Sequence, residues 1–253
     1  MAVVWRRKSG DSIYEVRSAG NSLRLYTNGV FHSQYNQQYP LAGSVWDLLV
    51  LPALFYSQNT IGRVLVLGVG AGAVICQLNA LVKPKHIVGV ELDPIHIDVA
   101  QRFFNVNTQR NTTLHAGEAR RWVRRYRGPR FDLVIEDLFF DDDDGEPQRA
   151  IAADKVWCRQ LQELLTPNGA LVINFDRAKV LNDSALRQEK QLRREFSTQF
   201  QLLTPGYDNR VGAFFRKPVT KQILTQRLRQ LEQEYGKPIT RRLNAKIRQL
   251  KTN

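Results

Sequence analysis

The sequence has few residues of the kinds that build cross-links or membrane spans. It holds only two cysteines, Cys76 and Cys158, far apart and without a CxxC pair, which argues against a disulfide framework and against a zinc site. The longest apolar run, residues 48–56, has roughly half the length that a bilayer requires. Residues 1–8 lack the apolar stretch of a signal peptide. We therefore expect a cytoplasmic protein without membrane contact.

Acidic residues are scarce at the C-terminal end. The formal net charge is +13, and from Arg216 to Asn253 eleven Lys and Arg face only Glu232 and Glu234. The rest of the chain is mildly basic. We therefore treat the charge as a property of a tail, which does not identify the chemistry.

Three regions are expected along the chain. Residues 1–45 contain short strand patterns separated by turn residues such as Asn28-Gly29, which predict a small N-terminal β unit. Residues 46–218 alternate strand and helix patterns, which predict a parallel sheet covered on both faces. Two apolar runs within residues 200–215 predict an antiparallel hairpin at its end. The fold class is therefore α/β, of the Rossmann-like type that methyltransferases use.

Residues 219–253 predict a basic amphipathic tail. Two stretches, 223–231 and 239–250, carry apolar residues at helical spacing and are separated by Gly236-Lys237-Pro238. We expect this tail to pack on the domain. Contact with nucleic acid and a homodimer contact remain alternatives, and the tail lacks the interleaved aromatic residues that stack on bases.

A glycine-rich loop joins the first strand of the main domain to its helix. Gly68, Gly70 and Gly72 would let the backbone turn tightly and approach a ligand, and the following helix offers free N–H groups. Glu91 ends the next strand, where an acid can accept hydrogen bonds from ribose hydroxyls. This combination predicts a nucleoside-containing cofactor. The loop also satisfies Gly-x-Gly-x-x-Ala, so NAD remains possible at this point.

Two later acids favour a sulfonium cofactor over NAD. Glu118, followed by Ala119, comes after the third strand, where it could contact an adenine amino group. Asp137 closes the fourth strand, at the carboxyl edge of the sheet where ligands bind.

The order of these motifs resembles the spermidine synthase family of polyamine aminopropyltransferases. The similar segments are Val64-Leu-Val-Leu-Gly-Val-Gly-Ala-Gly, Val88-Gly-Val-Glu-Leu-Asp-Pro, Gly117-Glu-Ala, Phe131-Asp-Leu-Val-Ile-Glu-Asp and Pro205-Gly-Tyr-Asp-Asn-Arg-Val-Gly. The resemblance implies S-adenosylmethionine or its decarboxylated form as cofactor, and no metal.

The resemblance also implies roles for single residues. The glycines and Glu91 would hold the ribose and the cofactor backbone, and Glu118 would contact adenine. Asp137 matches the catalytic aspartate that helps to deprotonate the attacking amine. Tyr207 would line the acceptor channel, and His32 stands where the family has a glutamine.

Two aspartates of the family are replaced in this sequence. Ala71 replaces an aspartate that binds the aminopropyl ammonium, and Phe140 replaces a second aspartate. An aminopropyl cation needs a partner in a partly desolvated site, whereas the carboxylate of S-adenosylmethionine would be repelled by an acid there. Ala71 therefore favours methyl transfer to a modest degree.

An acidic segment, residues 136–146, follows the fourth strand with seven acids in eleven residues. It is expected either to receive a cationic substrate, with Asp137 as general base and Phe140 and Asp141 as substrate contacts, or to be a solvated loop in which Asp137 alone acts. Consecutive aspartates lack the alternating spacing of a calcium loop.

The sequence thus predicts a transferase that moves a methyl or aminopropyl group to a small cationic or amine acceptor. Two alternatives remain. One is an NAD-dependent oxidoreductase, for which the chain has little room to encode a substrate domain. The other is an inactive binding protein of the same fold that uses its basic tail on nucleic acid.

Overall fold

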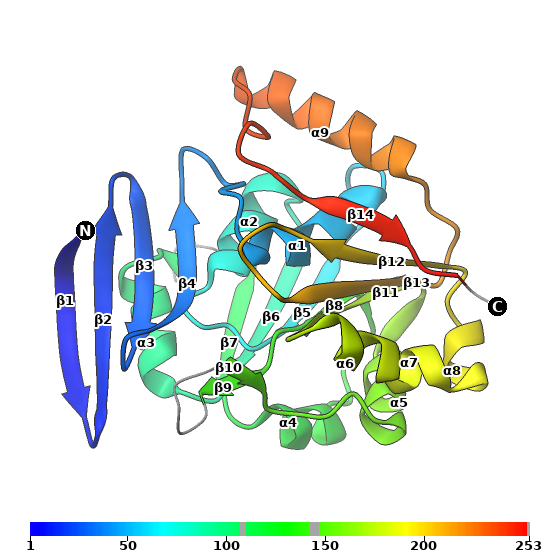
Figure 1. Ribbon diagram of the computed structural model, residues 1–253, viewed down its shortest axis with the longest axis horizontal. Helices are drawn as coiled ribbons and strands as arrows, with labels where there is room; N and C mark the ends of the chain where they lie inside the picture. The colour runs from blue at the N-terminus through cyan, green and yellow to red at the C-terminus, as the bar shows by residue number, and fades with distance from the viewer. Residues whose placement is uncertain (107–109, 142–146, 252–253) are drawn as a thin grey trace.

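The fold is built on a mostly parallel eight-stranded sheet with the order β14-β12-β13-β11-β8-β5-β6-β7 (Figure 1). The computed structural model describes residues 1–106, 110–141 and 147–251. Pairing among β11, β8, β5, β6 and β7 is parallel, and β13, β12 and β14 add antiparallel pairs at one side. This arrangement confirms the predicted α/β class and the closing hairpin. The strands are β5 (Arg63–Leu67), β6 (His86–Glu91), β7 (Thr112–Ala116), β8 (Phe131–Glu136), β11 (Leu165–Phe175), β12 (Thr198–Leu203), β13 (Arg210–Phe215) and β14 (Lys246–Gln249).

Helices cover both faces of the sheet because its central strands are apolar on both sides. In β5, Val64 and Val66 belong to one buried cluster, whereas Leu65 and Leu67 belong to the other. The first cluster lies under α1 (Val45–Val50), the 3-10 helix η1 (Leu51–Phe55), α2 (Ala73–Leu81), α3 (Pro94–Arg102) and α9 (Lys221–Tyr235). The second lies under α4 (Ala119–Arg125), α5 (Lys155–Glu163), α6 (Ala178–Asp183), α7 (Ala185–Gln188) and α8 (Lys190–Arg194). Within the described ranges, no helix has the length and apolar character to span a bilayer.

The N-terminal β unit is a four-stranded antiparallel sheet to one side of the main domain (Figure 1). Asn28 and Gly29 turn the chain between β3 and β4 with positive φ angles of 50° and 85°. The Asn28 side chain also accepts a hydrogen bond from the backbone N–H of Ile13, at 2.8 Å. The sheet consists of β1 (Ala2–Ser9), β2 (Ser12–Ala19), β3 (Ser22–Thr27) and β4 (Val30–Asn36).

The tail differs from the prediction in its second half. Helix α9 forms and buries Leu224 and Leu231 against the domain. Residues 239–250, however, do not form a helix, because β14 pairs antiparallel with β12 at the edge of the main sheet. Gly236 ends α9 in a left-handed conformation, and the unpaired backbone groups along β12 then supply partners that a solvated helix lacks.

Candidate active site

A cleft of about 580 Å³ opens at the carboxyl ends of β5, β6 and β8, beside the N-terminal sheet. Its described lining contains the carboxylates of Glu91, Asp93, Glu118 and Asp137, and no Lys or Arg. The cleft is therefore acidic in a chain whose net charge is +13. Such a lining attracts cationic ligands and repels anionic ones.

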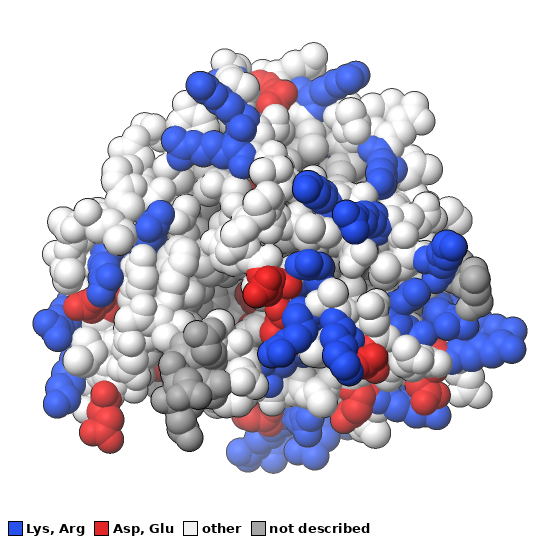
Figure 2. Space-filling model, viewed as in Figure 1, with Lys and Arg blue, Asp and Glu red and all other residues white. Residues whose placement is uncertain are grey.

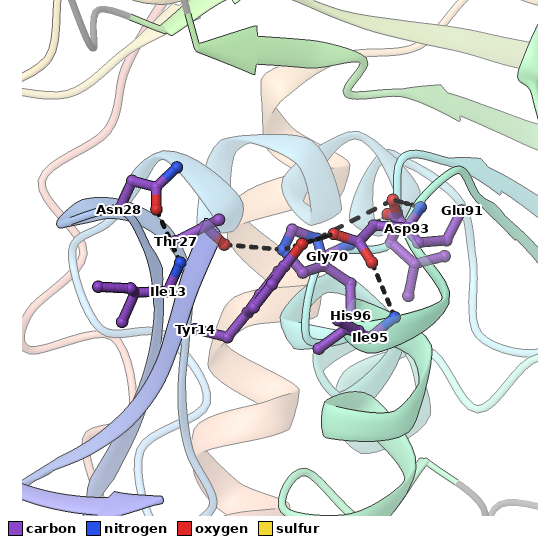
Figure 3. Close-up of polar contacts among 10 residues, drawn as sticks. Ile13, Tyr14, Thr27, Asn28, Gly70, Glu91, Asp93, Ile95 and His96 are labelled. Atoms are coloured by element: carbon purple, nitrogen blue, oxygen red, sulfur yellow. Dashed lines mark hydrogen bonds and ion pairs between the residues drawn. The ribbon is translucent and has the colours of Figure 1, made fainter. Parts of the chain in front are cut away.

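The carboxylate of Glu91 accepts hydrogen bonds from the backbone of the glycine loop. One carboxylate oxygen accepts the backbone N–H groups of Val69 and Gly70, both at 2.8 Å, and the other accepts that of Asp93 at 3.0 Å (Figure 3). At Gly68, a Cβ atom would lie 2.0 Å from the carbonyl oxygen of Asp137. Only glycine therefore lets the end of β5 approach the end of β8 so closely.

Asp137 follows β8 at the floor of the cleft. Its carboxylate accepts a hydrogen bond from the Asn174 amide at 2.8 Å, and Asn174 in turn accepts one from Asn209 at 3.1 Å. Burial raises the pKa of Asp137 to about 6 against the opposing effect of the Asn174 bond, and the negative charges of Glu136 and Glu91 add to the rise. The raised pKa brings the titration of this carboxylate closer to neutral pH, where a carboxylate can exchange a proton with a ligand.

A buried ion pair next to the cleft holds the end of β8 in place. Glu136 is fully buried, and both of its oxygens accept hydrogen bonds from Arg149, at 2.9 and 3.0 Å. Arg149 also donates to the carbonyl oxygens of Asn174 and Ile151. It lies at the end of the short hairpin of β9 (Phe139–Asp141) and β10 (Pro147–Arg149), so one side chain joins that hairpin to β8 and β11.

The N-terminal sheet closes the cleft through two polar contacts. The Tyr14 hydroxyl donates to Asp93 at 2.7 Å, and the Thr27 hydroxyl lies 3.0 Å from Nε2 of His96 (Figure 3). The rings of His96 and His32 are 5.2 Å apart between centroids. The sequence gives no local signal for Tyr14 or Thr27, because their partners are distant along the chain.

Nine of the predicted site residues line this one cleft: Gly68, Gly70, Glu91, Glu118, Ala119, Asp137, Tyr207, His32 and Phe140. Gly72 does not line it. It caps α2, and a Cβ atom there would lie 2.6 Å from the Val106 side chain. Ala71 is fully buried in the core. The side chain of Asp141 lies outside the described residues.

Asn174 and Asn209 were missed by the sequence analysis although both line the cleft. Asn174 lies one residue before the end of β11, and Asp137 directly follows β8. A polar residue at the carboxyl end of a parallel strand is therefore the signal that could have identified Asn174.

Replacing Tyr14 by phenylalanine tests the contact between the two sheets. Because the lost bond ends on a carboxylate, we expect the free energy of unfolding in urea to fall by about 1.5–3 kcal/mol. The matched control is Tyr26→Phe in the same sheet, whose hydroxyl makes a long contact with the Met1 sulfur, at 3.8 Å. Equal stability of the two variants would contradict the role of Tyr14.

The cleft fits an adenosyl-sulfonium cofactor. Its volume is in the range that ligand sites of this size occupy. At Gly117, beside Glu118, a Cβ atom would enter open space, so the backbone there is accessible to a flat ring. The acidic lining suits a sulfonium cation, whereas the pyrophosphate of NAD would meet four carboxylates and no described Lys or Arg. Within the described ranges, no three His, Cys, Asp or Glu side chains are grouped to hold a metal ion.

Part of this sequence is similar to proteins of known name. A polyamine aminopropyltransferase of Vibrio vulnificus is 31% identical over 114 residues, covering 44% of this chain and 37% of that protein. An eEF1A lysine and N-terminal methyltransferase homolog of Drosophila melanogaster is 27% identical over 133 residues, covering 50% of this chain and 19% of that protein. The matched stretch thus spans less than half the length of either relative.

Solved structures share the fold. A probable spermidine synthase from Corynebacterium glutamicum superposes with a TM-score of 0.69 at 16% identity, covering 98% of this chain and 91% of that one. Human methyltransferase-like protein 13, solved in complex with SAH, gives a TM-score of 0.62 at 19% identity, covering 76% of this chain and 92% of that one. The main domain therefore has the methyltransferase-like fold.

The model of the spermine/spermidine synthase domain matches residues 48–218, which include the glycine loop, Asp137 and the closing hairpin. The chain belongs to the spermine/spermidine synthase family of transferases.

Proposed function

We propose that this chain binds S-adenosylmethionine or decarboxylated S-adenosylmethionine and transfers a methyl or aminopropyl group to an amine, with Asp137 as general base. The observation that supports this most is the position of Asp137. It lies at the floor of an acidic cleft, next to the glycine loop, with a pKa raised to about 6.

For this transfer the protein must position the cofactor and the amine and remove one proton from the amine. The bound cofactor supplies an electrophilic carbon next to its sulfonium. A nucleophilic amine must lose a proton, and the carboxylate of Asp137 can accept it. The Asn174 amide, fixed by Asn209, orients that carboxylate. The other acids of the cleft draw the protonated amine in from water.

Two observations bear on the transferred group and favour different answers. Ala71 removes the acid that would pair with an aminopropyl ammonium, which favours methyl transfer. The cleft, however, has no described Lys or Arg that could pair with the carboxylate of S-adenosylmethionine, which favours the decarboxylated cofactor. Direct binding measurements separate the two.

Calorimetry with S-adenosylmethionine, its decarboxylated form, methylthioadenosine and NAD tests the proposal. We expect one sulfonium compound to bind, and Gly70→Asp to weaken its binding by more than about tenfold. The added Cβ atom would lie 3.3 Å from the carbonyl oxygen of His32, so the glycine loop or β4, which both line the cleft, would have to shift. Gly20→Asp is the matched control, since Gly20 has a similar positive φ of 58° in a turn of the N-terminal sheet. Binding of NAD alone, or of none of the four, would overturn the proposal.

A further inference from the structure

Helix α4 and the turn after it carry an unusual concentration of arginine. Six arginines fall between residues 120 and 130, and all six are exposed. We call them the α4 arginine surface: Arg120, Arg121, Arg124, Arg125, Arg127 and Arg130. They gather at the lower edge of the molecule in Figure 2, where Figure 1 places α4.

No acid of the described chain is ion-paired to this surface, although Glu163 of α5 lines a depression together with three of its arginines. Among the residues that the structure describes, none of the six arginines is in an ion pair. The carboxylate of Glu118 instead accepts the backbone N–H groups of Arg120 and Arg121. Arg121 and Arg125 are separated by four residues on one helix, a spacing at which like charges repel and destabilise. Like charges are thus collected on one surface without an ion-pair partner among the described residues, which points to an anionic ligand.

Aromatic rings lie within the arginine surface. Trp122 and Tyr126 are half-buried and stack on each other with ring centroids 4.7 Å apart at 21°. Next to them is a depression of about 450 Å³, lined by Arg124, Arg127 and Arg130, and by α5 on its other side. Arginine combined with aromatic rings is typical of surfaces that hold phosphates and stack on bases.

We propose that the α4 arginine surface binds the phosphate backbone of a nucleic acid. A lipid surface fits less well, since no large exposed hydrophobic side chain lies on α4 in the described chain. An acidic protein would use the charges but not the stacked rings. The proposal does not depend on the transferase activity. It places the ligand beside the cleft, because Glu118 caps α4 and also lines the cleft.

The test is fluorescence anisotropy with a labelled single-stranded RNA and a labelled DNA duplex of about 20 nucleotides per strand, at about 50 mM and about 200 mM salt. We expect the wild-type chain to bind one or both, more weakly at the higher salt. The variant Arg121→Gln/Arg124→Gln/Arg125→Gln/Arg130→Gln should bind more than about tenfold more weakly, and its salt slope on RNA should fall by about 3.

The matched control removes four charges from the tail: Arg229→Gln/Arg241→Gln/Lys246→Gln/Arg248→Gln. It should retain most of the affinity. Thermal melting shows whether the α4 variant is folded, and we expect its melting temperature to stay close to that of the wild type because all four side chains are exposed. Absence of binding at the lower salt, equal binding by the α4 variant, or loss confined to the tail variant would overturn the proposal. Equally tight binding of polyglutamate would also overturn it.

Discussion

Replacing Asp137 by asparagine is expected to slow transfer strongly while making the folded protein more stable at neutral pH. The asparagine keeps the size of the side chain and a carbonyl oxygen for the Asn174 amide, but it cannot accept the proton of the amine. Loss of a general base lowers kcat by about 10²–10⁴-fold. Stability should rise by about 1–3 kcal/mol, because a carboxylate whose pKa is raised to about 6 by burial is unfavourable when ionised.

The pH dependence of stability gives a second measurement of the same effect. The pKa of Asp137 rises from 3.8 to about 6 on folding, so the folded chain binds this proton more tightly than the unfolded chain. Its contribution to wild-type stability therefore falls as the pH rises between these values, and the loss is complete above about pH 6. The melting temperature of Asp137→Asn should exceed that of the wild type by more at pH 8 than at pH 5.

Asp98→Asn is the control for this experiment. Asp98 is partly exposed on α3 and forms an ion pair with Arg102, at 3.1 Å. Its replacement should leave turnover and melting temperature nearly unchanged. Full turnover by Asp137→Asn would show that another group accepts the proton. A lower melting temperature at every pH would show that the carboxylate stabilises the fold.

The central sheet was predictable because each parallel strand is a short apolar run and each is followed by a helix pattern. Val64 and Leu67 both lie inside β5, and Phe131 and Glu136 mark the observed ends of β8. The end of the tail was not predictable in this way. Ile247 fits a helical repeat with Leu243, but β12 offers it backbone partners far away in the sequence. Such non-local pairing overrides local periodicity.

Contacts between residues distant in the sequence also explain why some site residues were predicted and others were not. Glu91 and Asp137 follow strands directly, and the carboxyl edge of a parallel sheet is where ligands bind. Tyr14 and His96 each contact residues far away in the sequence, where the N-terminal sheet packs against α3. Local sequence patterns do not predict such contacts. The arginines of the α4 surface are adjacent in the sequence, but the fold is needed to show that all six are exposed on one helix and the turn after it.

Replacing Arg149 by leucine is expected to be among the most destabilising single changes in this chain. It would leave the carboxylate of Glu136 fully buried without its cation, since Trp157 offers only one further contact, at 3.4 Å. Removing one partner of a buried ion pair costs about 3–5 kcal/mol. For a chain of this size, the melting temperature should fall by about 6–20 °C, as circular dichroism would measure.

The double variant Glu136→Met/Arg149→Leu separates the ion pair from the packing around it. With both members of this ion pair removed, we expect most of the lost stability to return, because apolar side chains of similar volume often replace buried ion pairs without cost. Transfer activity should not return. Arg149 also donates to the carbonyl oxygen of Asn174, whose amide orients Asp137. A double variant that melts like the wild type but turns over slowly would identify Arg149 as a positioning residue. Full recovery of both properties would limit Arg149 to neutralising Glu136.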